Sequence, residues 1–389
     1  MKTPLYKKSN RIQKILPVLL VTLFCVVFVP SVAFADTVDD LKQEVDNGLE
    51  NIDFSEVENV SQPFFENFAE KVKQIINGEF DDTETFLKVL AELFAQNVVS
   101  VLPQLLSIFC VLVICGLVRR TSEGFISADT EKVVSFVGVT VVIFSVLSLV
   151  FEAYKQVVEL LSRVSALTDA AMPILLTLMI ANGGTVASSV CQPAMVVFSS
   201  AVITVVKNVI LPLSVFGLTF VVVGNLSDNV RIGKMSDFFN SCSSWCLGVT
   251  FTVFSAFTAV QGISAASIDG VSYRAAKFAA KNYIPILGGY ISDGFDIIVA
   301  STSLIKNAFG AVAMLLVFFI AVKPLITLVC VNLGLQAVAA VGEPLADARY
   351  IKILNGFGKC LTFLSALVVA VAFMFCILTL VAISCANFA

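Results

Sequence analysis

The 389-residue sequence contains no histidine and few charged residues. Without an imidazole, the chain cannot form Ser-His-Asp or Cys-His catalytic groups, a histidine zinc site or a histidine haem ligand. Charged residues make up 14% of the chain, the formal net charge is -4, and no basic run follows the extreme N-terminus. The composition therefore excludes histidine-based catalysis. It also indicates no basic patch to which a nucleic acid could bind.

Apolar residues, in contrast, are in excess. They make up 58% of the chain, and the mean hydropathy is +0.93. Soluble globular domains contain about 45–50% apolar residues and about 25% charged residues. The surplus apolar surface must face lipid. Because no apolar run alternates with a period of two, as membrane barrel strands do, we expect an all-α, polytopic helical membrane protein.

Two regions precede the apolar runs. Residues 1–35 fit a secretory signal peptide, with a basic start, an apolar stretch and the cleavage pattern Ala33-Phe34-Ala35; an uncleaved signal anchor is the alternative. Residues 36–97 are acidic at first and carry apolar residues at helical spacing, with a break at Asn77-Gly78. We expect an exported, amphipathic helical segment, whose acidic face is either solvated or a docking surface.

Residues 98–389 form the predicted transmembrane domain. A membrane-spanning helix needs about 17–25 residues. On this criterion the sequence predicts crossings at 98–118, 133–151, 186–206, 209–224, 246–266, 307–322, 325–341 and 361–386. If residue 36 lies outside the cytoplasm, this topology assigns most Lys and Arg of the connecting segments to the cytoplasmic side, as membrane proteins favour.

Two apolar segments do not fit ordinary crossings. Residues 171–184 and 284–306 both begin near a Pro-Ile-Leu sequence and contain a Gly-Gly pair. An apolar hairpin follows each, with expected turns at Lys207-Asn208 and Lys323-Pro324. Because the two units would enter the membrane from opposite sides, they predict an inverted repeat with broken or re-entrant helices, as in many transporters. Chance recurrence in a chain rich in these residues is the alternative.

The second segment carries the candidate site. Its polar and small residues fall on one helix face, which we call the polar seam: Gly289, Asp293, Asp296, Ser303 and Asn307. A carboxylate inside a membrane costs at least about 2.5 kcal/mol and needs a reason. The seam is either a water-lined path, a polar contact between helices, or a segment at the interface with both acids in water. We expect no enzyme, because catalytic aspartate pairs normally come from two facing segments.

The ten cysteines indicate no metal or cofactor. Most lie in or beside apolar runs, where cysteine acts as a small hydrophobic residue. Cys242 and Cys246 are four residues apart, but no second pair and no histidine accompany them, so a zinc site is poorly supported. We interpret the cysteines as structural.

Five motifs in order carry a family resemblance. They are Ile75-Ile76-Asn77-Gly78-Glu79-Phe80, Met172-Pro173-Ile174-Leu175, Gly183-Gly184, the 285–310 block PILGGYISDGFDIIVASTSLIKNAFG, and Glu343-Pro344-Leu345-Ala346-Asp347 followed by Arg349. After its signal the chain resembles the stage III sporulation protein AE family of endospore-forming Firmicutes. The resemblance implies a multi-pass protein of the mother-cell membrane around the forespore. It also implies a channel apparatus shared with the other stage III sporulation A-series proteins and stage II sporulation protein Q.

This resemblance gives the sequence features provisional roles and supplies no catalytic residues. Residues 36–97 would face the space between the two membranes. The loop with Glu343, Pro344, Asp347 and Arg349 would face the cytosol, either binding a partner or capping the bundle. The function we expect is a membrane component of the mother-cell/forespore channel. The alternative is an independent secondary transporter of a small solute.

Overall fold

The computed structural model describes Leu49 and residues 52–61, 68–76, 83–122, 128–182, 185–226, 233–283, 288–344 and 348–384. The predicted signal peptide lies outside these residues, as does most of the acidic start of the exported segment. Every regular element among the described residues is helical, which confirms the all-α prediction.

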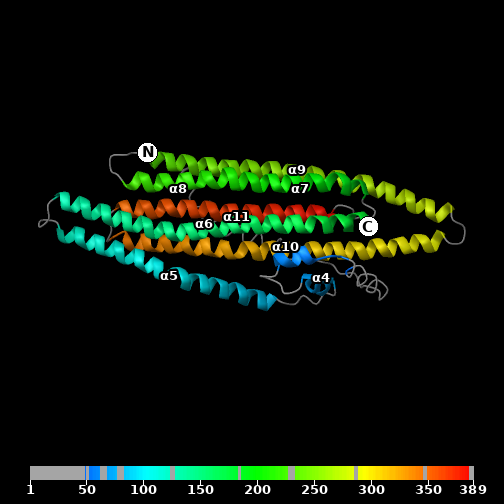
Figure 1. The fold of residues 1–389 in the computed structure, drawn as a ribbon, viewed down its shortest axis with the longest axis horizontal. Helices are drawn as coiled ribbons and strands as arrows, with labels where there is room; N and C mark the ends of the chain where they lie inside the picture. Colours follow the sequence, from blue (N-terminus) through cyan, green and yellow to red (C-terminus); the bar gives the residue numbers. More distant parts are fainter. Residues whose placement is uncertain are drawn as a thin grey trace.

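The helices form an elongated bundle in which they lie side by side (Figure 1). Two short helices come first, α3 (Ser55–Ser61) and α4 (Phe68–Ile76). The long elements are α5 (Thr83–Ser122), α6 (Ala128–Ala181), α7 (Thr185–Val205), the π-helix η1 (Val206–Ile210), α8 (Leu211–Leu226), α9 (Gly233–Tyr283), α10 (Gly288–Gly342) and α11 (Ala348–Ser384). In Figure 1, α6, α10 and α11 lie between α5 and the layer of α7, α8 and α9.

The described residues contain six helices that are long and apolar enough to cross a membrane: Ala91–Val118, Phe136–Ala181, Pro193–Leu226, Lys234–Gln261, Asp296–Gly342 and Ala348–Ser384. The prediction of eight crossings is therefore wrong in number. Two of the six helices each join a pair of predicted crossings, one through Lys207 and the other through Lys323.

Packing explains why the two expected turns are helical. At the first, the Lys207 ammonium donates a hydrogen bond of 3.1 Å to the Ser162 hydroxyl on α6, so the helix continues as η1 and then α8. At the second, Pro324 is buried inside α10. A proline removes one helix hydrogen bond, but packing against neighbouring helices outweighs such a local preference. The described residues show no inverted repeat, and residues 171–181 continue α6 without a break.

The described residues of the segment predicted to be exported pack on the bundle at α10. The Phe54 and Phe309 rings stack with their centroids 6.1 Å apart, and Val57, Val72 and Ile75 are buried. The Asp53 carboxylate accepts a 3.0 Å hydrogen bond from the Ser55 amide at the start of α3. Hydrogen bonds from the Ser55 side chain and backbone lower the pKa of Asp53. The short helices thus join the same core as the long ones.

Candidate functional site

The two segments singled out in the sequence meet at one hydrogen bond. Asn182 follows the last residue of α6, and its side-chain amide donates to the Ser303 hydroxyl on α10 at 3.1 Å. Asn182 is fully buried, and its carbonyl oxygen has no hydrogen-bond partner among the described residues. At Ser303, the polar seam makes a contact between helices. Sequence reasoning did not identify Asn182 as a site residue, because an asparagine directly before a Gly-Gly pair is typical of a helix end.

Lys306 lies one turn beyond Ser303 on α10 and is fully buried. Phe309, the next turn along, is also fully buried and stacks on Phe54. A buried ammonium is costly unless it is paired. The structure puts Lys306 inside the bundle, close to the region covered by α3 and α4. No periodicity argument would reveal this, because the burial comes from elements distant in sequence.

The remaining seam residues lie in different surroundings. Asp296 is half-buried, whereas Asn307 is exposed. Gly289 and Asp293 belong to α10, but their side-chain surroundings lie outside what the structure describes. The polar seam as a water-lined path therefore stays a prediction.

The predicted partner-facing loop joins α10 to α11. Glu343 and Pro344 are exposed, Arg349 is half-buried in the first turn of α11, and Asp347 lies outside the described residues. Beside Arg349, Tyr350 is buried, and a side chain added at Gly138 on α6 would collide with its hydroxyl and with Cys115 on α5. Three helices thus meet tightly under this loop, leaving Glu343 and Pro344 accessible.

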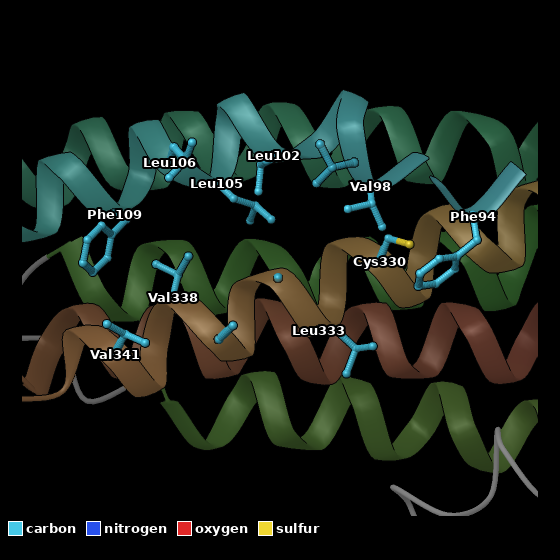
Figure 2. Close-up of a pocket in the computed structure, with 13 residues that line it drawn as sticks. Phe94, Val98, Leu102, Leu105, Leu106, Phe109, Cys330, Leu333, Val338 and Val341 are labelled. Carbon is cyan, nitrogen blue, oxygen red and sulfur yellow. The ribbon is translucent and has the colours of Figure 1, made fainter. Parts of the chain in front are cut away.

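A groove of about 500 Å³ runs between α5 and α10 (Figure 2). Residues of α5, including Phe94, Leu102 and Phe109, face residues of α10, including Leu333 and Val341. The only polar side-chain atom in its lining is the Cys330 sulfur, so the groove offers almost nothing to orient a polar substrate. Among the described residues, no three His, Cys, Asp or Glu side chains are grouped to hold a metal ion, and Cys242 and Cys246 are not disulfide-bonded.

Comparison with known proteins identifies the relatives of this chain. Residues 66–386 match the family model described as Stage III sporulation protein AE. A curated relative, Stage III sporulation protein AE of Bacillus subtilis (strain 168), is 24% identical over 315 residues, which cover 81% of this chain and 79% of the relative. No solved structure matches the chain.

Proposed function

Because the chain belongs to the stage III sporulation protein AE family, a family of sporulation membrane proteins not known as enzymes, we propose that it is a membrane component of the channel apparatus joining mother cell and forespore. The family match over residues 66–386 carries this proposal. Six candidate membrane helices support a multi-pass location. Its partners would be the other stage III sporulation A-series proteins and the stage II sporulation protein Q complex.

The proposed orientation places residues 36–97 outside the cytoplasm, in the space between the two membranes. Since α3 and α4 pack on α10, partners in that space would meet a surface fixed to the bundle. The loop at Glu343 and Pro344 would face the mother-cell cytosol. With six crossings both ends of the chain beyond the signal remain on the outer side, as in the original topology.

The experiment is to delete the gene in its spore-forming host and complement it with variants, measuring heat-resistant spores, protein level and cross-linking to the proposed partners. We expect Arg349→Glu to abolish spore formation at a normal protein level if the loop binds a partner. Lys352→Glu, an exposed charge reversal one turn away, serves as the matched control. Loss of the Arg349→Glu protein would instead identify the loop as a structural cap.

The alternative of an independent transporter has lost its structural argument, because residues 171–181 and 288–306 lie in continuous helices rather than broken ones. The purified protein in liposomes separates the two functions. Uptake of a defined solute by the protein alone would contradict the channel-component proposal, whereas recovery of the deletion strain only in the presence of the partner proteins supports it.

A further inference from the structure

The two candidate spans that are least buried expose different kinds of side chain. Among the six candidate spans of the described residues, Ala91–Val118 of α5 and Lys234–Gln261 of α9 have the smallest buried share. The exposed side chains of α5 are large and apolar, among them Leu102, Leu106 and Ile114. The α9 span is the least hydropathic of the six. The open side of α5 therefore suits lipid better than the open side of α9 does.

Small and polar residues form one strip along α9. An α-helix turns by about 100° per residue, so positions three or four apart share a face. Larger apolar residues, including Phe238 and Val249, lie beside the strip on the same helix. A side chain added at Gly248 would meet nothing within 4 Å, so the chain itself makes no use of the space that this glycine leaves. The strip consists of Asp237, Ser241, Ser244, Gly248, Thr252 and Ser255, of which all but the half-buried Ser255 are exposed.

α11 runs in the same direction as α9 (Figure 1), and two contacts align the two helices. The Lys359 ammonium lies 2.9 Å from the Asp237 carboxylate, and these side chains are 58% and 66% exposed. The Phe373 ring stacks on Phe251 with centroids 6.0 Å apart. The partners in both pairs are 122 positions apart in the chain. Residues of α9 and α11 that differ by 122 therefore lie at the same level.

α11 continues the small surface of α9 at matching levels. Ala366 lies level with Ser244, and Ala370 lies level with Gly248. The two alanines are half-buried, and the two α9 residues are exposed. Small residues on the surface of a membrane helix allow a further helix to approach closely. We call the following residues the α9–α11 face: Asp237, Ser244, Gly248, Lys359, Ala366 and Ala370.

A two-fold axis above the α9–α11 face would match the face with itself. Two copies of a membrane protein share one orientation, so the axis runs along the membrane normal and keeps each residue at its level. In such a contact the same patch serves both copies, and α9 of each lies opposite α11 of the other. Asp237 of one copy would face Lys359 of the other, and Gly248 would face Ala370. A second copy therefore brings opposite charges and small residues to the face at the correct levels.

We propose that the α9–α11 face binds a second copy of this chain and forms a symmetric dimer in the membrane. Lys359 and Asp237 of the two copies alternate in a ring of four charges, in which each charge has opposite charges as neighbours. Close approach at Gly248 supplies the van der Waals packing that drives helix association in lipid. The dimer does not depend on the proposed role in sporulation.

Charge reversal separates contacts between copies from contacts within one copy. In Asp237→Lys both positions of the pair are positive, and in Lys359→Asp both are negative. Each variant alone places four like charges in the ring, so we expect its dimerisation constant to fall by at least about tenfold. A mixture of the two variants pairs a positive copy with a negative one. We expect this mixture to recover wild-type pairing, although the ion pair within each copy stays broken.

Energy transfer between donor-labelled and acceptor-labelled full chains in liposomes measures the dimerisation constant over a range of protein-to-lipid ratios. Glu159→Lys, an exposed reversal at the ion pair of α6, is the matched control and should pair like the wild type. Gly248→Leu should also lower the constant by at least about tenfold, because it adds bulk where the helices of the two copies meet. Val249→Leu, at the exposed neighbouring position beside the strip, should leave the constant unchanged.

Each variant is first checked for a wild-type unfolding temperature in detergent, and Gly248→Leu carries the test if a charge variant fails this check. Absence of energy transfer between wild-type copies would overturn the proposal and mean that lipid or another protein covers the face. Loss of pairing in both charge variants without recovery in their mixture would also overturn it, because the charges would then act only within one copy. Unchanged pairing of Gly248→Leu would place the contact elsewhere.

Discussion

The two ends of the bundle differ in how often their helices approach closely. Toward the α5–α6 connection, backbones approach closely at several glycines: a side chain at Gly217 would meet Asn240, one at Gly334 would meet Leu105, and one at Gly356 would meet Val221. Toward the α9–α10 connection, Gly310 is such a position, where a side chain would meet Ile383. Aromatic rings stack at both ends, as Phe220 does on Phe239 with centroids 5.2 Å apart and Phe198 does on Phe257 with centroids 4.0 Å apart. The hydrophobic drive between membrane helices is weak, so close backbone approach contributes much of their packing.

The largest expected effect comes from placing one charge inside a candidate span and one outside every span. Phe144→Arg should cost about 2.5–3.5 kcal/mol of insertion free energy, because this side chain is exposed in the candidate span Phe136–Ala181 and the arginine would face lipid. Glu56→Arg, at an exposed position of α3 outside every candidate span, should cost almost nothing. The amount of protein extracted from the membrane fraction measures both. Equal losses for the two variants would break the comparison.

Glycine substitutions sharpen the packing difference. Gly356→Ala should destabilise the protein by about 1–3 kcal/mol, because the added carbon meets Val221, a buried residue that is stiff about its first side-chain bond. Gly310→Ala, toward the α9–α10 connection, meets the flexible end of Ile383 and should cost less. Thermal unfolding in detergent gives both values. Gly248→Ala, with nothing within 4 Å, is the control and should be neutral or stabilising.

Two hydrogen bonds between helices allow the same comparison for polar contacts. Asn182 donates to Ser303 at 3.1 Å toward the α9–α10 connection, and Asn332 donates to Thr362 at 3.0 Å toward the α5–α6 connection. Double-mutant cycles with alanine should give coupling energies of about 0.5–1.5 kcal/mol for each pair. Chemical unfolding in detergent micelles provides the measurement. A coupling near zero for Asn182 and Ser303 would show that their contact holds no helices together.

The smallest effect belongs to exposed ion pairs on the surface of the bundle. Lys359 and Asp237 are 2.9 Å apart and well over half exposed. Lys359→Ala should destabilise the bundle by only about 0.2–1 kcal/mol, an effect that falls with added salt. Glu159→Gln, which removes the 2.8 Å ion pair with Arg163, should have a similarly small effect. A loss several times larger, unaffected by salt, would mean that the pair is shielded from water.

Part of the candidate site was accessible to sequence reasoning. The motif order identified the family, and helical spacing placed Ser303 and Asp296 on one segment. The contact between Ser303 and Asn182 could not be predicted from the sequence, because it depends on the end of α6 lying beside α10. The two residues are 121 positions apart in the chain. The burial of Lys306 likewise depends on packing around α10.

The number of crossings shows where sequence and tertiary structure divide. Composition alone determined that the chain is helical and membrane-embedded, because the excess of apolar residues must meet lipid and only helices satisfy their backbone groups there. The lysines at 207 and 323 looked like turns because a charge interrupts each apolar run. In the folded bundle both lysines lie inside continuous helices. There the Lys207 ammonium donates a hydrogen bond to the Ser162 hydroxyl, and Lys323 interacts electrostatically with Glu159. Helix continuity is decided by such contacts between helices, which no single segment of sequence contains.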